Sequence, residues 1–269
     1  MLQYVATGVS VWLGQPMGRG VTNAGIVVEA DGVTVIDTLI GGTRTEACAA
    51  AIEAIGPPVR RVVLTSSHVP YVGGAGRFRL AAVYGTSQIS AHLDQPPNID
   101  GYRRLYPDVA DQFDDMAARA VSHIVTDAAW LTPAIIAVPT KGQIEQNLVV
   151  QVPGAGVVFA GAMCSFGVRP LAFDGDPAAW ADALDRVIEL GEIIVPGQGP
   201  VGTAADVGIV QQYLRACVDA AGDVRRLGTG PWERWACPEF DAVNVERAAM
   251  LAGGDRVVPP SMRPLLGID

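Results

Sequence analysis

Two hairpin patterns, each followed by a helical pattern, restrict the fold of this chain more than any other feature. Tight turns join the apolar strands of each pair, at Asp31-Gly32 and at Gly154-Ala155-Gly156. The paired runs are Gly25–Ala30 with Val33–Leu39, and Leu148–Val152 with Val157–Ala160. Helices are predicted after each pair, over Thr43–Ile55 and Ala178–Leu190. The repeated arrangement indicates two sheets with helices packed outside them.

Weaker patterns fill the rest of the chain. Arg60–Thr65 predicts a short buried strand, and the following segment 66–74 is expected to be a loop because Pro and paired Gly interrupt regular elements. Strands are predicted over Phe78–Tyr84 and Ile89–His92. The polar segment 98–120 predicts a helical insertion or lid, and residues 239–269 a C-terminal helix and tail. We expect one domain over residues 1–269.

Composition excludes several classes of function. With 49% hydrophobic and 17% charged residues, the 269-residue chain can bury a large core. Its net charge of −9 disfavours nucleic acid as a partner. No apolar run reaches the ~18 residues of a membrane helix, so no membrane association is expected. The N-terminus has no secretory pattern, and the four cysteines are widely spaced, so a cytoplasmic protein with reduced thiols is expected.

Several landmarks in register resemble the metallo-β-lactamase superfamily. Asp37 ends an apolar strand, Thr65 ends the next, and the loop after Thr65 closes with Gly73-Gly74. The late motifs are Val157-Val158-Phe159-Ala160-Gly161 and Val195-Pro196-Gly197-Gln198-Gly199-Pro200. The resemblance covers roughly residues 20 to 215 and implies an α/β fold, the four-layer αββα sandwich, with the site at one edge between the sheets.

The same resemblance implies that the metal centre is depleted. The family loop reads Thr-His-x-His-x-Asp-His-x-Gly-Gly, and its side chains hold one or two metal ions, usually zinc. The corresponding positions here are Ser66, His68, Pro70, Tyr71, Gln143, Ala162 and Gln198. Only His68 keeps the family's ligand type, so we expect no metal and no cofactor.

The emptied site predicts acid/base chemistry on a small neutral molecule. Histidine is the side chain that most readily exchanges a proton at neutral pH, so His68 is the candidate general acid/base, while Tyr71 is a candidate donor to a developing oxyanion. Asp37 is expected to orient His68. The residues expected to line the substrate site are Ser66, Ser67, Lys141, Gln143, Glu145, Cys164 and Gln198.

Three functions stay open. The first is a metal-independent enzyme of small-molecule biosynthesis that performs cyclisation, dehydration or hydrolysis; some superfamily members act on polyketide-type intermediates. The second is a non-catalytic binding or scaffold protein, favoured if Tyr71, Met163 and Phe166 fill the cleft. The third is a residual hydrolase with one weak metal ion on His68 and Cys164.

Other segments give secondary expectations. Tyr102, Arg103, Arg104 and Tyr106 in the insertion are candidates to face the pocket, with a solvated helix face as the alternative. His92 and His123 are expected far from the pocket, and Asp174-Gly175-Asp176-Pro177 is interpreted as a turn. Exposed apolar sheet edges favour a homodimer.

Overall fold

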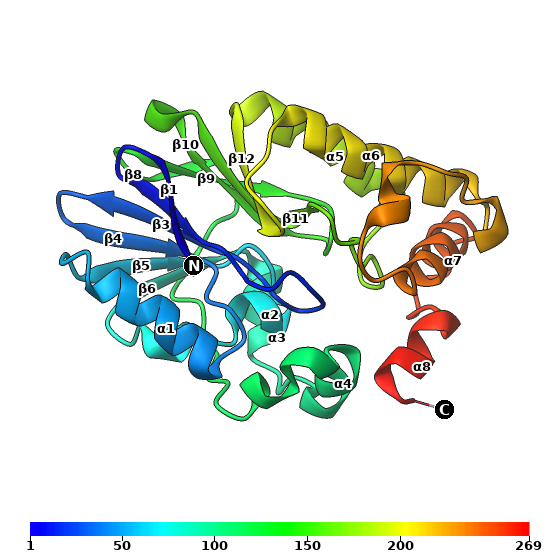
Figure 1. Cartoon of the computed structure of the whole chain (residues 1–269), viewed down its shortest axis with the longest axis horizontal. Helices are drawn as coiled ribbons and strands as arrows, with labels where there is room; N and C mark the ends of the chain where they lie inside the picture. Colours follow the sequence, from blue (N-terminus) through cyan, green and yellow to red (C-terminus); the bar gives the residue numbers. More distant parts are fainter. Residues whose placement is uncertain (269) are drawn as a thin grey trace.

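The computed structural model describes residues 1–268 and arranges them in four layers, with two β-sheets between layers of helices (Figure 1). In strand order, the seven-stranded sheet is β1 (Leu2–Ala6), β2 (Val9–Trp12), β3 (Ala24–Glu29), β4 (Gly32–Ile36), β5 (Val59–Val63), β6 (Ala82–Gly85) and β7 (His123–Ile124). The five-stranded sheet is β12 (Ile193–Gln198), β11 (Val157–Ser165), β10 (Asn147–Val152), β9 (Ile135–Thr140) and β8 (Ala129–Thr132). The predicted αββα architecture is confirmed.

Each sheet is covered on its outer face by helices. The first sheet packs against α1 (Gly42–Glu53) and α3 (Ser87–Leu93) through one apolar cluster, which includes Ile52 and Ile89. The second packs against α5 (Pro177–Leu190) and α6 (Ala204–Asp219), where Trp180 is fully buried. Figure 1 shows these helix layers on opposite sides of the paired sheets.

Successive residues of the central strands face two different apolar clusters, one beneath the helices and one between the sheets. In β4, Val35 faces the α1 layer while the next residue, Ile36, faces the second sheet. Phe159 of β11 reaches the same inter-sheet cluster from the other side. Because both faces of these central strands are covered, their side chains are mostly apolar on both.

A fourth cluster closes one end of the sandwich. It joins α4 (Ile99–Leu105) and the 3₁₀ segment Pro107–Phe113 to α7 (Phe240–Ala252) and to the region around α8 (Arg263–Leu266). Figure 1 shows α4 and α8 beyond the same end of the sheets. None of the helices within residues 1–268 is both long and apolar enough to cross a membrane.

Two local predictions were wrong, and one hairpin had no prediction. Residues Ile89–His92 are helical, within α3, because the Thr86 side chain caps that helix by accepting a hydrogen bond from the Ile89 N–H (3.2 Å). The predicted loop contains the short helix α2 (Val69–Val72), which tolerates Pro70 in its first turn, where an N–H has no helical partner. The β1–β2 hairpin was not predicted.

Candidate functional site

The ends of the strands bring the predicted site positions together at one small cavity. His68 and Tyr71 follow β5, Gln143 precedes β10, Ala162 lies in β11, and Gln198 ends β12. All five line a cavity of about 30 Å³. A volume of that size holds one or two water molecules, whereas pockets for substrate-sized ligands are roughly 300–1,000 Å³. The family's register therefore predicted the place correctly, but the space there is nearly filled.

His68 is the centre of a chain of side-chain hydrogen bonds. Ser66 Oγ donates to Gln143 Oε1 (2.7 Å), and the Gln143 amide donates to His68 Nδ1. His68 Nε2 lies 2.9 Å from Asp174 Oδ2. Because Gln143 supplies a hydrogen to Nδ1, the hydrogen of the neutral ring is on Nε2 and points at the carboxylate. The Phe173 ring stacks on the imidazole, with centroids 5.1 Å apart.

The carboxylate beside His68 is Asp174, which the sequence analysis assigned to a turn. Burial raises the pKa of Asp174, but the hydrogen bond and the charge of His68 outweigh it, so the pKa lies below its ordinary value. The Asp174 side chain is 38% exposed, so the pair reaches solvent. The turn interpretation holds for Asp176, which caps α5 by accepting from the Ala178 and Ala179 N–H groups.

Asp37 does not orient His68, contrary to the prediction. Its carboxylate accepts hydrogen bonds from the Thr65 N–H (2.8 Å) and the Thr65 hydroxyl (2.7 Å). Burial raises the pKa of Asp37 to about 7, although the two bonds from Thr65 lower it. Its backbone is in the left-handed region, with φ of 59°. Asp37 thus joins the ends of β4 and β5, beneath the site.

Tyr71 and Gln198 fill the opposite wall of the cavity. Tyr71 is buried beside the Gln198 side chain. Burial raises the pKa of Tyr71 well above its usual value, and the Asp37 carboxylate raises it further, although the Gln198 side chain lowers it, so the hydroxyl keeps its proton at neutral pH. Gln198 Oε1 is buried with no hydrogen-bond partner within residues 1–268, and the cavity has room for a water that would satisfy it.

The other predicted lining residues lie elsewhere. Lys141 and Glu145 are exposed and do not line the cavity. Cys164 packs into the apolar cluster beneath α5 and α6, where burial raises the pKa of its thiol. Ser67 also lies outside the cavity and pairs with His92 (Oγ to Nδ1, 2.7 Å). The expectation that His92 lies far from the site is therefore wrong.

The insertion covers the cavity through one of its predicted residues. Tyr106 lines the cavity, and its ring packs against Gly20, where a Cβ would approach the ring to 2.8 Å. Arg103 pairs with Asp100 and Asp114, and the Arg104 side chain donates to backbone carbonyls near the C-terminus. The arginines are thus engaged away from the cavity, as in the solvated-face alternative.

The residues that line the cavity without having been predicted include Arg169 and Phe240. Arg169 is 6% exposed, and its Nε donates to Asp241 Oδ1 of α7 (2.6 Å). Phe240, the first residue of α7, closes the same wall. Both depend on the C-terminal helix lying across the site, and no local pattern near either residue predicts that placement.

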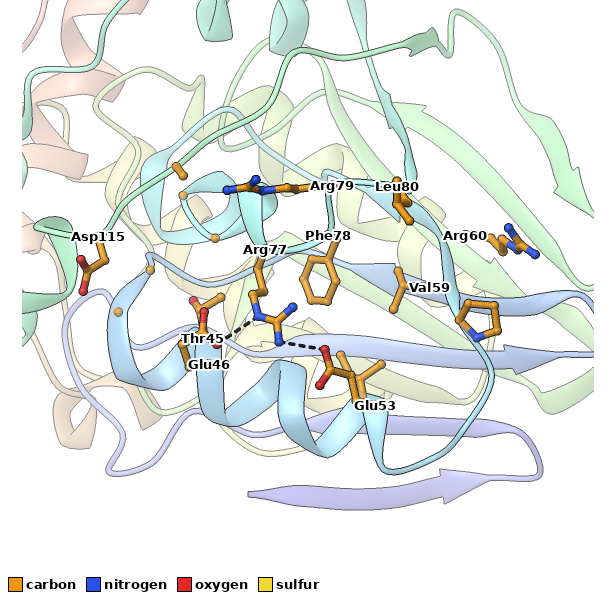
Figure 2. Close-up of a pocket in the computed structure, with 18 of the residues that line it drawn as sticks. Thr45, Glu46, Glu53, Val59, Arg60, Arg77, Phe78, Arg79, Leu80 and Asp115 are labelled. Atoms are coloured by element: carbon orange, nitrogen blue, oxygen red, sulfur yellow. Dashed lines mark hydrogen bonds and ion pairs between the residues drawn. The ribbon is translucent and has the colours of Figure 1, made fainter.

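A much larger groove lies away from this site, beside α1. Its volume is about 790 Å³, and it runs between α1 and the segment Gly73–Leu80. Figure 2 shows Arg77 reaching from that segment to Glu46 and Glu53 on α1. These ion pairs bridge the groove, and Arg77 is engaged by both carboxylates.

The sequence profile of the metallo-β-lactamase superfamily matches residues 17–198, about two thirds of the chain. The chain belongs to this superfamily. Its fold is similar to the solved metallo-β-lactamase FIM-1 from Pseudomonas aeruginosa in its mono-zinc form (TM-score 0.61, 18% identity, 80% of this chain and 94% of that one). It is also similar to the enzymes of Erythrobacter litoralis (TM-score 0.60, 19% identity, 80% and 95%) and Pontibacter korlensis (0.62, 17%, 79% and 98%). At these identities the likeness establishes the fold.

The superfamily implies a zinc centre, but the residues at these positions do not fit one. Zinc in proteins takes about three or four nitrogen, sulfur or oxygen ligands from side chains. Both ring nitrogens of His68 are already hydrogen-bonded, to Gln143 and Asp174. Pro70 and Ala162 have no side-chain atom that can coordinate a metal ion. Within residues 1–268, no three His, Cys, Asp or Glu side chains are grouped to hold a metal ion.

Proposed function

We propose that this chain is a non-catalytic member of the metallo-β-lactamase superfamily that acts as a binding or scaffold protein. One observation carries the proposal: the position of the superfamily's reaction centre is a cavity of about 30 Å³. Its walls are side chains that bond to one another, and the insertion and α7 cover it with Tyr106 and Phe240. A substrate would have to displace these rings and break the bonds of His68.

The proposal is tested by metal content and turnover together. The purified protein is analysed for zinc and iron before and after loading, and is assayed with a cephalosporin, an aryl ester and an acyl thioester. We expect far less than one metal per chain, and rates that are equal for the wild type, His68→Ala and the control His123→Ala. Turnover that His68→Ala abolishes while His123→Ala retains it, or one metal per chain, would contradict the proposal.

A second candidate is the metal-independent acid/base enzyme of small-molecule biosynthesis, and the observation that favours it is the His68–Asp174 pair. The Asp174 carboxylate is 38% exposed, and it orients an imidazole that lines the cavity. Such a pair can accept and return a proton if Tyr106 moves off the cavity. The chemistry would be cyclisation, dehydration or hydrolysis.

The two candidates are separated by a panel of β-keto thioesters, the substrates that polyketide-type chemistry would supply. Turnover by the wild type that is lost in both His68→Ala and Asp174→Asn supports the enzyme and overturns the non-catalytic proposal. Equal background rates in all three proteins support the non-catalytic proposal. Thermal melts of each variant establish that any loss is not unfolding.

A further inference from the structure

A second hollow lies next to the filled cavity, on the α1 side of the segment that joins β2 to β3. Its volume is about 180 Å³. Gly20 lines both hollows, and none of the other residues lining this pocket lines the filled cavity. This pocket, named here the α1 pocket, is thus a separate site whose occupancy does not depend on the chemistry at His68.

The lining of the α1 pocket is apolar with a polar edge. The apolar residues come from the end of β2, from the β4–α1 turn and from α1. They are Met1, Trp12, Leu13, Val21, Leu39, Ile40 and Ala47. Polar side chains are contributed by Gln15, Thr22, Thr43, Arg44 and Gln112. This combination is typical of sites that enclose a small organic molecule and fix one polar group of it.

Arg44 is the charged side chain of this pocket, and no carboxylate within residues 1–268 forms an ion pair with it. The only side-chain hydrogen bond of Arg44 within residues 1–268 runs from Nη1 to the Gln15 carbonyl (3.0 Å), and no acidic side chain there forms an ion pair with it. The guanidinium therefore keeps donors free, and a carboxylate can take two of them side by side.

The location of Arg44 adds to this excess of positive charge. It lies in the first turn of α1, a 12-residue helix with no acidic residue in that turn and no side-chain cap. Helix N-termini are positively polarised, so a cation is unfavourable there unless an anion accompanies it. The Arg44 guanidinium is the group that binds the ligand. The positive end of the helix adds to the electrostatic field of the guanidinium.

The backbone around the pocket is held in uncommon conformations. Leu39, which lines the pocket, has φ of 63°, a region that costs a branched side chain about 1 kcal/mol or more. The next turn uses Gly41 and Gly42, and a Cβ on Gly42 would meet Gln112 Oε1 at 2.7 Å. These conformations keep the wall between β4 and α1 open instead of letting it collapse onto Arg44.

We propose that the α1 pocket binds a small monocarboxylate with one ring or one branched aliphatic group. The carboxylate pairs with Arg44 at the edge, and the apolar body lies against Trp12 and Ile40. Size supports this class, because apolar cavities of about 150 Å³ bind benzene, and the α1 pocket has about 180 Å³.

The test uses benzoate and 3-methylbutanoate as probes and benzyl alcohol as the neutral analogue. Binding is measured by calorimetry, and the site is located by the shift of the Trp12 indole resonance, assigned with Trp12→Phe. We expect both acids to bind with millimolar or tighter affinity, and benzyl alcohol to bind at least about tenfold more weakly, the usual scale for one charged hydrogen-bonded contact.

Variants make the result decisive. Arg44→Gln should weaken benzoate binding about tenfold or more, whereas the matched control Arg60→Gln should not change it; Arg60 is exposed and also donates to one backbone carbonyl. His68→Ala should leave binding unchanged, so failure here is distinct from failure of the proposed function. No binding of either acid at 10 mM (about 2.7 kcal/mol of binding free energy), or equal binding to Arg44→Gln, would overturn the proposal.

Discussion

The two hollows that share Gly20 differ in how their polar groups are satisfied. Around the filled cavity, Ser66, Gln143, His68 and Asp174 are bonded in sequence to one another. In the α1 pocket, Arg44 has one backbone partner and faces an apolar wall. The comparison teaches that the superfamily's ligand positions in this chain hold side chains bonded to one another, while the pocket whose charged side chain has no ion-pair partner among the described residues lies elsewhere.

Asp37 connects the two hollows and gives the largest predicted effect. It follows β4, just before the Leu39–Gly41 wall of the α1 pocket, and it is bonded to Thr65, which precedes Ser66. Its pKa is about 7 in the folded chain. The carboxyl ionises in the unfolded chain near pH 4, but in the folded chain only near pH 7. The free energy of unfolding therefore decreases as the pH rises from about 4 to about 7.

The substitution Asp37→Asn removes the ionisable group and with it this decrease in the free energy of unfolding. We expect the variant to gain stability relative to the wild type by up to about 4 kcal/mol between pH 4 and pH 7. Urea unfolding across that range measures the difference. A difference that does not change with pH would mean that the carboxyl is ionised in the folded protein throughout.

A pair of glutamine substitutions tests whether the filled cavity is core. Gln143→Ala leaves the donor of the buried Ser66 hydroxyl and His68 Nδ1 without a partner, and should cost about 2–3 kcal/mol of unfolding free energy. Gln112 lines the α1 pocket, and Gln112→Ala removes only part-buried bonds: one to the Asp111 carboxylate (2.7 Å) and two contacts of Oε1 at 3.2 and 3.5 Å. It should cost about 1 kcal/mol. Equal losses in chemical denaturation would remove the distinction between the two hollows.

The smallest predicted effects come from enlarging one alanine in each hollow. Ala162→Leu adds more volume than the cavity of about 30 Å³ provides, and should cost about 1–2 kcal/mol through overpacking. Ala47→Leu enters the α1 pocket of about 180 Å³ and should stay within about 0.5 kcal/mol of the wild type. Ala47→Leu should also weaken benzoate binding. A large loss of stability in Ala47→Leu would show that this pocket is tightly packed.

The sequence predicted the long elements well because their patterns are strong. The β3–β4 and β10–β11 hairpins and helices α1 and α5 lie where alternation and amphipathic spacing placed them. Ile89–His92 was misassigned because a short apolar run fits a strand or a helix equally, and only the Thr86 cap decides. The β1–β2 hairpin has no strong turn pattern, and β1 is mostly exposed or half-buried.

The site was predictable in position but not in bonding. The superfamily's register placed His68, Gln143 and Gln198 at one cavity. The partner of His68 is a residue 106 positions later in the chain, Asp174, whose local pattern indicates only a turn. Contacts of this kind depend on how β11 and α5 lie against α2, and a single sequence carries no record of that geometry.

The hydrogen bonds among the side chains around His68 also limit which substitutions could build a metal site there. Gln143→His would return one zinc-type side chain, but it would take away the amide that now bonds both Ser66 and His68. Gln143→His alone would therefore weaken the protein without assembling a metal site. A metal centre at these positions requires several changes made together, because the side chains present there hold one another in place.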